Sequence, residues 1–146
     1  MTMLLHDRIC AKPLVHELPY IRQYASQFML KAGIDDAFNH ELCLAIDEAC
    51  TNIMIHGKKD ADTLITISLE YHEDCCKVTI EDNALAFNPL EIPPKNMDEY
   101  FTKKQYGGLG MEIIRRLIDE IKYEHSQLHY PWNTLSLVKY FHTSSH

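Results

Sequence analysis

The chain has 146 residues, of which 46% are hydrophobic and 24% are charged, and its formal net charge is -7. This length and balance predict a single globular domain over residues 1–146, large enough to bury a core without disulfides. The acidic charge argues against a basic face that binds nucleic acid or anionic lipid, but it leaves room for a local phosphate site built from backbone N–H groups.

No segment indicates export or membrane insertion. The N-terminal apolar run is too short for a signal peptide, and no stretch approaches the length of a membrane span. The five cysteines are odd in number and include no CxxC pair, which favours reduced thiols. We therefore expect a cytoplasmic protein with no membrane partner.

The first half of the chain predicts a strand, two helices and two more strands. A strand over 4–10 precedes a helix over 19–32 that ends at Gly33. The next helix starts at a cap on Asp35 or Asp36 and stops at Gly57. Strands over 64–71 and 77–82 follow, with alternating apolar residues on one face.

The second half opens with an irregular segment over 83–106 that contains three prolines. Such a length without regular structure is typical of functional lids or mobile loops, although residues 97–101 predict a short helix. A glycine-rich turn then leads into a helix over 111–120 and strands over 121–126 and 134–141. The pattern predicts an α/β fold in which hairpins are favoured over a doubly wound parallel sheet.

Glu48 and Asn52 are four residues apart on the second predicted helix, so they lie on one helix face. An amide oxygen placed there suits Mg²⁺, which prefers hard oxygen ligands, and a carboxylate can deprotonate an attacking hydroxyl. An ExxxN pair alone is more often a solvated helix flank.

Asp82 follows Val78 and Ile80 at a spacing of two, which predicts that its side chain points to the same inward face. A buried carboxylate needs a donor, and an adenine amino group or a turn amide would serve. Asp82 and Asn83 are also ordinary turn residues.

The chain has five glycines, and three of them fall at Gly107, Gly108 and Gly110. Small residues before a helix let backbone N–H groups close on an anion at the positive helix end. A turn that binds nothing is an equal alternative. Neither the P-loop pattern nor the dinucleotide fingerprint fits this turn.

His125 and His129 have metal-like spacing only on a helix. Because this region predicts strand and turn, we assign no metal to them.

Taken in order, three stretches resemble the GHKL (Bergerat-fold, histidine-kinase-like) ATPase superfamily: 48–52, 82–89 and 107–111. Within it the chain is most similar to the bacterial anti-sigma factor serine/threonine kinases, and the similarity covers nearly the whole chain. The resemblance implies a two-layer α/β sandwich with a mixed or antiparallel sheet covered on one face by about three helices.

The resemblance also implies a role for each matching residue. Glu48 would be the general base, Asn52 the Mg²⁺ ligand beside the ATP phosphates, and Asp82 the acceptor for the adenine amino group. Residues 88–106 would form the ATP lid. The other residues implied in nucleotide binding are Asn83, Ala84, Ala86, Phe87, Gly107, Gly108, Leu109, Gly110 and Met111.

Proteins of this kind phosphorylate a serine or threonine of a STAS-domain antagonist, and the unphosphorylated antagonist releases a captured sigma factor. The resemblance therefore implies an ATP-binding anti-sigma kinase with a STAS-domain partner, a possible sigma factor partner and a possible homodimer. It does not name the sigma factor, the antagonist or the signal.

The first glycine box departs from the family pattern, because Ala84 and Ala86 stand where glycines are usual. If either position needs positive φ, alanine would be strained by roughly 1–2 kcal/mol; if only small size is needed, alanine is tolerated. The alternative function is accordingly a partner-switching or anti-sigma binding module without catalysis.

Overall fold

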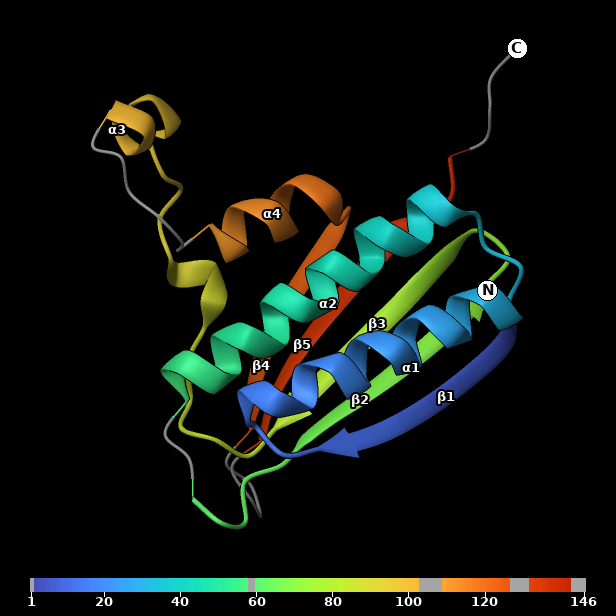
Figure 1. Ribbon diagram of the computed structural model, residues 1–146, viewed down its shortest axis with the longest axis horizontal. Helices are drawn as coiled ribbons and strands as arrows, with labels where there is room; N and C mark the ends of the chain where they lie inside the picture. The colour runs from blue at the N-terminus through green and yellow to red at the C-terminus, as the bar shows by residue number, and fades with distance from the viewer. Residues whose placement is uncertain (1, 58–59, 103–108, 127–131, 143–146) are drawn as a thin grey trace.

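The computed structural model describes residues 2–57, 60–102, 109–126 and 132–142. Its described part has two layers, a five-stranded sheet and helices α1, α2 and α4 that cover one face of it, while α3 lies away from the sheet (Figure 1). Every neighbouring pair of strands is antiparallel. The predicted α/β sandwich is therefore confirmed. In chain order the elements are β1 (Met3–Ala11), η1 (Val15–Glu17), α1 (Leu18–Lys31), α2 (Asp36–His56), β2 (Ile65–His72), β3 (Cys75–Asp82), η2 (Pro89–Glu91), α3 (Met97–Thr102), α4 (Gly110–Leu117), β4 (Glu120–Ser126) and β5 (Trp132–Tyr140).

The strand order is β1-β2-β3-β5-β4, so β5 lies between β3 and β4. Alternate residues of each strand face the helices, as the period of two requires. The buried apolar residues of the central strands are Ile65, Ile67, Leu69, Val78, Ile80, Leu135 and Leu137. They pack in one cluster with Ile21, Met29, Leu42, Ile46, Ala49 and Ile114 of the helices.

Helix α2 begins and ends where the sequence predicts. The Asp35 side chain accepts a hydrogen bond from the Phe38 backbone N–H at 2.9 Å, which satisfies one of the free donors of the first turn. Gly57 follows the last helical residue. The helix is thus held at both ends, and it carries Glu48 and Asn52 in a fixed orientation.

The prediction of a helix over 111–120 is wrong at its end, because α4 stops at Leu117. The buried ammonium of Lys139 donates to the Leu117 carbonyl at 2.8 Å and pairs with Glu41 at 3.0 Å. The Asp119 backbone N–H already bonds to Val138 of β5. Sheet pairing and a cation at the helix C-terminus therefore end α4 earlier than its apolar pattern predicts.

In the described part of the chain, no helix combines the length and the apolar character that crossing a bilayer requires.

Candidate functional site

The start of α4 lies directly against Glu48 and Asn52 of α2. A Cβ atom placed on Gly110 would come within 2.8 Å of Glu48 Oε2 and 3.5 Å of Asn52 Oδ1. Glycine is therefore the residue that lets the N-terminus of α4 approach both side chains. The structure brings together two motifs that lie about sixty residues apart in the sequence.

Glu48 has the electrostatic character of a proton acceptor. Partial burial raises the pKa of its carboxyl above the ordinary value, and the neighbouring charge of Asp47 raises it further. A carboxylate with a raised pKa binds a proton more readily, which suits general-base chemistry near neutral pH.

Asn52 supplies a polar group that the protein leaves unsatisfied. Its Nδ2 atom is buried and makes no hydrogen bond within the described residues. Buried polar groups of folded proteins are nearly always paired, so an orphan of this kind indicates a ligand position. The amide oxygen of Asn52 and the Glu48 carboxylate are hard oxygen donors, and this donor set fits Mg²⁺.

Asp82 lies at the end of β3 and is 5% exposed. Its Oδ1 atom accepts hydrogen bonds from the Ala84 backbone N–H at 3.0 Å and from Asn133 Nδ2 at 2.9 Å. Burial raises the pKa of Asp82, and these two bonds together with His125 oppose the rise. Both hydrogen bonds fall on one oxygen, so within the described residues Oδ2 has no donor and can accept one from a ligand.

Ala84 packs against the end of α2. It is buried, and a Cβ atom on Gly57 would come within 2.9 Å of the Ala84 methyl group and 2.7 Å of the Ile53 carbonyl. The methyl group that replaces the family's glycine is therefore accommodated by a glycine opposite it. Ala86 is exposed.

Two further residues of the predicted first box have clear contacts. The Phe87 ring stacks on His56, with ring centroids 4.5 Å apart. The Asn83 side chain instead binds the segment before β2, accepting from the Leu64 N–H and donating to the Asp62 carbonyl. Both ends of its amide are engaged within the protein, so its predicted contact with a nucleotide stays a prediction.

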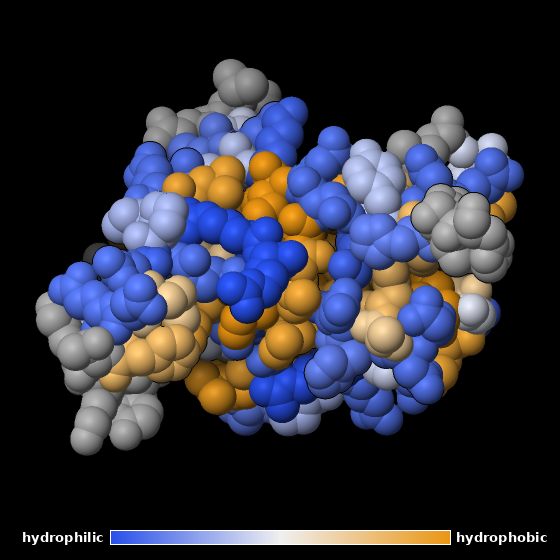
Figure 2. All heavy atoms as spheres, turned by 90° about the horizontal axis from the view of Figure 1, so that it is seen from above, coloured by the Kyte–Doolittle hydropathy of each residue, from blue (hydrophilic) through white to orange (hydrophobic). Residues whose placement is uncertain are grey.

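The first part of the predicted lid is tied to α4. The Arg115 guanidinium donates to the carbonyls of Leu90 and Ile92, and Glu112 accepts from the Lys95 backbone N–H at 3.0 Å. A groove of about 350 Å³ lies alongside, lined by Met97, Leu109, Glu112, Ile113, Arg115 and Arg116. The face of the molecule seen from above has hydrophobic residues lying between hydrophilic ones (Figure 2).

The predicted glycine turn is described only in part. Gly107 and Gly108 lie outside the described residues. Leu109 precedes α4 as its N-cap, and Met111 is 2% exposed and belongs to the core cluster. Met111 therefore anchors the first turn of α4 in the core.

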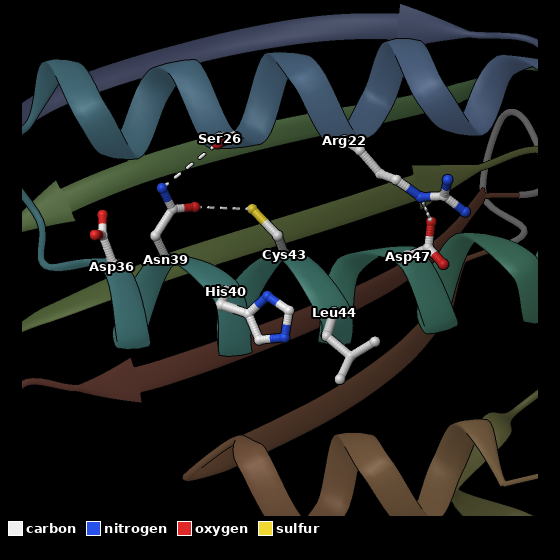
Figure 3. Close-up of a pocket in the computed structure, with 8 residues that line it drawn as sticks. All are labelled: Arg22, Ser26, Asp36, Asn39, His40, Cys43, Leu44 and Asp47. Atoms are coloured by element: carbon white, nitrogen blue, oxygen red, sulfur yellow. Dashed lines mark hydrogen bonds and ion pairs between the residues drawn. The ribbon is translucent and has the colours of Figure 1, made fainter.

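A separate cavity of about 460 Å³ lies between α1 and α2 (Figure 3), and its lining consists of Arg22, Ser26, Asp36, Asn39, His40, Cys43, Leu44 and Asp47. Arg22 pairs with Asp47, and Asn39 bonds to both Ser26 and Cys43. Because these polar groups satisfy one another, this cavity is a weaker candidate for a functional site than the surroundings of Glu48 and Asn52.

Three residues of the site were missed from the sequence: Asn133, Tyr123 and His125. Tyr123 and His125 both bond to Asn133 at 2.8 Å. Asn133 precedes Leu135 and Leu137 at a spacing of two, which is the signal that singled out Asp82. A polar residue on an inward strand face is therefore the sequence signal that indicates Asn133.

The family model for the histidine kinase-like ATPase domain matches residues 12–139. The chain belongs to this family. The match spans the helix with Glu48 and Asn52, the strand that ends at Asp82 and the start of α4.

Curated proteins similar to this chain include several named serine-protein kinase RsbW. The one from Listeria innocua is 30% identical over 130 residues, which are 81% of this chain and 80% of that protein. The one from Listeria monocytogenes has the same identity and coverage. The protein from Bacillus mycoides is 31% identical over 91 residues, which are 60% of this chain and 57% of its own length.

Proposed function

We propose that this protein binds ATP with Mg²⁺ and transfers the terminal phosphoryl group to a serine or threonine of a STAS-domain antagonist, as an anti-sigma regulatory kinase. The observation that carries the proposal is the approach of Gly110 to Glu48 and Asn52, which assembles a base, an amide and a helix N-terminus at one point. Similarity to serine-protein kinases supports the reaction.

The nucleotide would lie along α2 between two groups of residues. Glu48 is nine residues before Gly57, which is about 13 Å along a helix at 1.5 Å per residue. Asp82 and Ala84 lie at the Gly57 end and would hold the base, while Asn52 and the start of α4 would hold the phosphates. A nucleotide can bridge this span.

In the transfer step Glu48 would accept the proton of the attacking hydroxyl, so that the oxygen can bond to phosphorus as the bond to the leaving diphosphate breaks. Asn52 would hold Mg²⁺, which when bound neutralises charge on the phosphate oxygens. The N-terminal N–H groups of α4 would stabilise the same charge.

Ala84 and Ala86 favour a second candidate, a partner-switching module that binds partners without transferring phosphate. The packing of Ala84 against Gly57 shows that there is room for a methyl group at position 84, but it says nothing about position 86. Phosphate transfer distinguishes the two functions.

The test is to incubate the protein with Mg-ATP and a STAS-domain protein from the same organism and to measure intact mass. We expect the antagonist to gain one phosphoryl group. An antagonist whose acceptor serine or threonine is replaced by alanine should gain none. ATP binding by calorimetry without any transfer would support the second candidate and overturn the kinase.

Gly110→Ala should separate activity from stability. The added methyl group meets the mobile end of Glu48, so the carboxylate moves aside and the melting temperature changes little. A displaced base slows transfer by about ten- to a hundredfold. Arg116→Ala, an exposed change on the same helix, is the matched control and should leave the rate unchanged. Equal phosphate-transfer rates for Gly110→Ala and Arg116→Ala would contradict a role for the close approach of Gly110 to Glu48.

A further inference from the structure

Asp82, Asn133 and His125 form one polar row across three strands. In the sheet register Asp82 pairs with Asn133, and Asn133 pairs with His125. Side chains of directly paired residues point to the same sheet face. Tyr123 lies two residues before His125 and so faces the same side. These polar residues lie on the same sheet face as the apolar core residues, at the end of the sheet where the adenine base would bind.

The Asn133 amide, 4% exposed, makes four hydrogen bonds, which is the full capacity of its two N–H donors and two lone pairs. Its nitrogen lies 3.0 Å from the Ala84 carbonyl and 2.9 Å from Asp82 Oδ1. A carbonyl only accepts, so the nitrogen must face this side. The amide oxygen then faces Tyr123 and His125, and both must donate to it.

This arrangement determines which oxygen of the Asp82 carboxylate binds the protein and which is left for a ligand. With the amide in its observed orientation, Oδ1 is occupied by two internal donors and Oδ2 remains for a ligand donor. A flipped amide would turn its oxygen toward Asp82 and the Ala84 carbonyl, placing three acceptors together. The carboxylate would then lose one of the two bonds that orient it.

We propose that Tyr123 and His125 are positioning residues that hold the Asn133 amide, and through it Asp82, in one orientation, so that the site selects a 6-amino purine over a 6-oxo purine. This inference rests on the proposed nucleotide binding and adds the source of base selectivity.

The test is to measure ATP and GTP affinities by calorimetry for single and double variants. Tyr123→Phe and His125→Leu should each change the ATP affinity by less than about threefold, because the amide oxygen keeps one donor. The double variant leaves that oxygen without a donor. A buried oxygen without a donor favours displacement of the amide from Asp82. If the amide is then in place only about one time in ten, the ATP dissociation constant rises about tenfold and the ratio of ATP to GTP affinity falls by the same factor.

Two controls separate positioning from a general loss of structure. Tyr123→Phe combined with His125→Gln retains an amide donor and should restore much of the selectivity. Tyr140→Phe removes a tyrosine hydroxyl that bonds to Glu120 elsewhere on the same strand pair, and it should leave both affinities unchanged. If the double variant does not fold, the single variants His125→Leu and His125→Gln are compared, and a fall in the ATP-to-GTP affinity ratio of up to about threefold is expected only for leucine.

An unchanged ATP-to-GTP ratio in a folded double variant overturns the positioning role and leaves the proposed kinase standing. Failure of the unaltered protein to bind any nucleotide overturns both. Equal loss of ATP and GTP affinity shows a merely structural role and also overturns the inference.

Discussion

Glu48→Gln should greatly slow phosphate transfer while ATP binding survives. Glutamine keeps the shape of the side chain but cannot accept a proton, and loss of a general base slows a reaction by about 10²–10⁴-fold. Intact mass of the antagonist over time gives the rate, and calorimetry gives the ATP affinity, which we expect to change by less than about threefold.

The pH dependence of the unaltered protein should identify the same group. Only the ionised carboxylate accepts a proton, so the rate should fall as the pH is lowered through the Glu48 pKa. Burial and Asp47 raise that pKa, which places the fall above the range of an ordinary glutamate. The residual activity of Glu48→Gln should not show this fall at low pH. If the rates of both proteins fell with the same midpoint, the titrating group would be another residue.

Asp82→Asn should remove ATP binding without destabilising the protein. The Asn oxygen can still accept from Ala84 and Asn133, but an amide NH₂ replaces Oδ2 and meets the adenine amino group donor to donor. A buried donor left unpaired reduces affinity by roughly ten- to several-hundredfold. Calorimetry measures this loss directly. Glu81→Gln, which removes a carboxylate from the opposite face of β3, is the matched control and should bind ATP normally.

The stability of the Asp82→Asn protein without nucleotide provides an independent check. Burial raises the pKa of Asp82, so the folded state holds the proton more tightly than the unfolded chain does. Stability is therefore lost as the pH rises from the unfolded value through the raised folded value. Asparagine does not titrate, so at neutral pH the variant should melt no lower than the unaltered protein. A large drop in melting temperature would mean that Asp82 serves the fold and not a ligand.

Much of the fold followed from local patterns, and the exceptions have physical causes. Caps and apolar periodicity located α2, because Asp35 and Gly57 mark its ends in the sequence itself. The end of α4 was not predictable in this way, since it depends on Lys139, a residue of the final strand.

In the candidate site, too, local patterns indicate some residues, whereas other features depend on packing between distant segments. Glu48 and Asn52 were found because four-residue spacing on a helix is a local property, and Asp82 because strand alternation is one too. Their approach to Gly110 follows from packing and could be expected only by resemblance. The donors to Asn133 are brought in by the register of β4 against β5, and the predicted hairpin does not indicate which residues pair in it.

The placement of β5 also has a consequence for how the protein is made. It is the last strand of the described chain, yet it lies inside the sheet, between β3 and β4. As the chain leaves the ribosome, α2 can form early, but Asp82 lacks its amide partner and β4 has no neighbour until β5 has been synthesised. Such long-range pairing is slow to form. A nucleotide that needs Asp82 in place should therefore bind only the finished sheet, so that ATP present in the cell stabilises the completed chain and not its growing precursors.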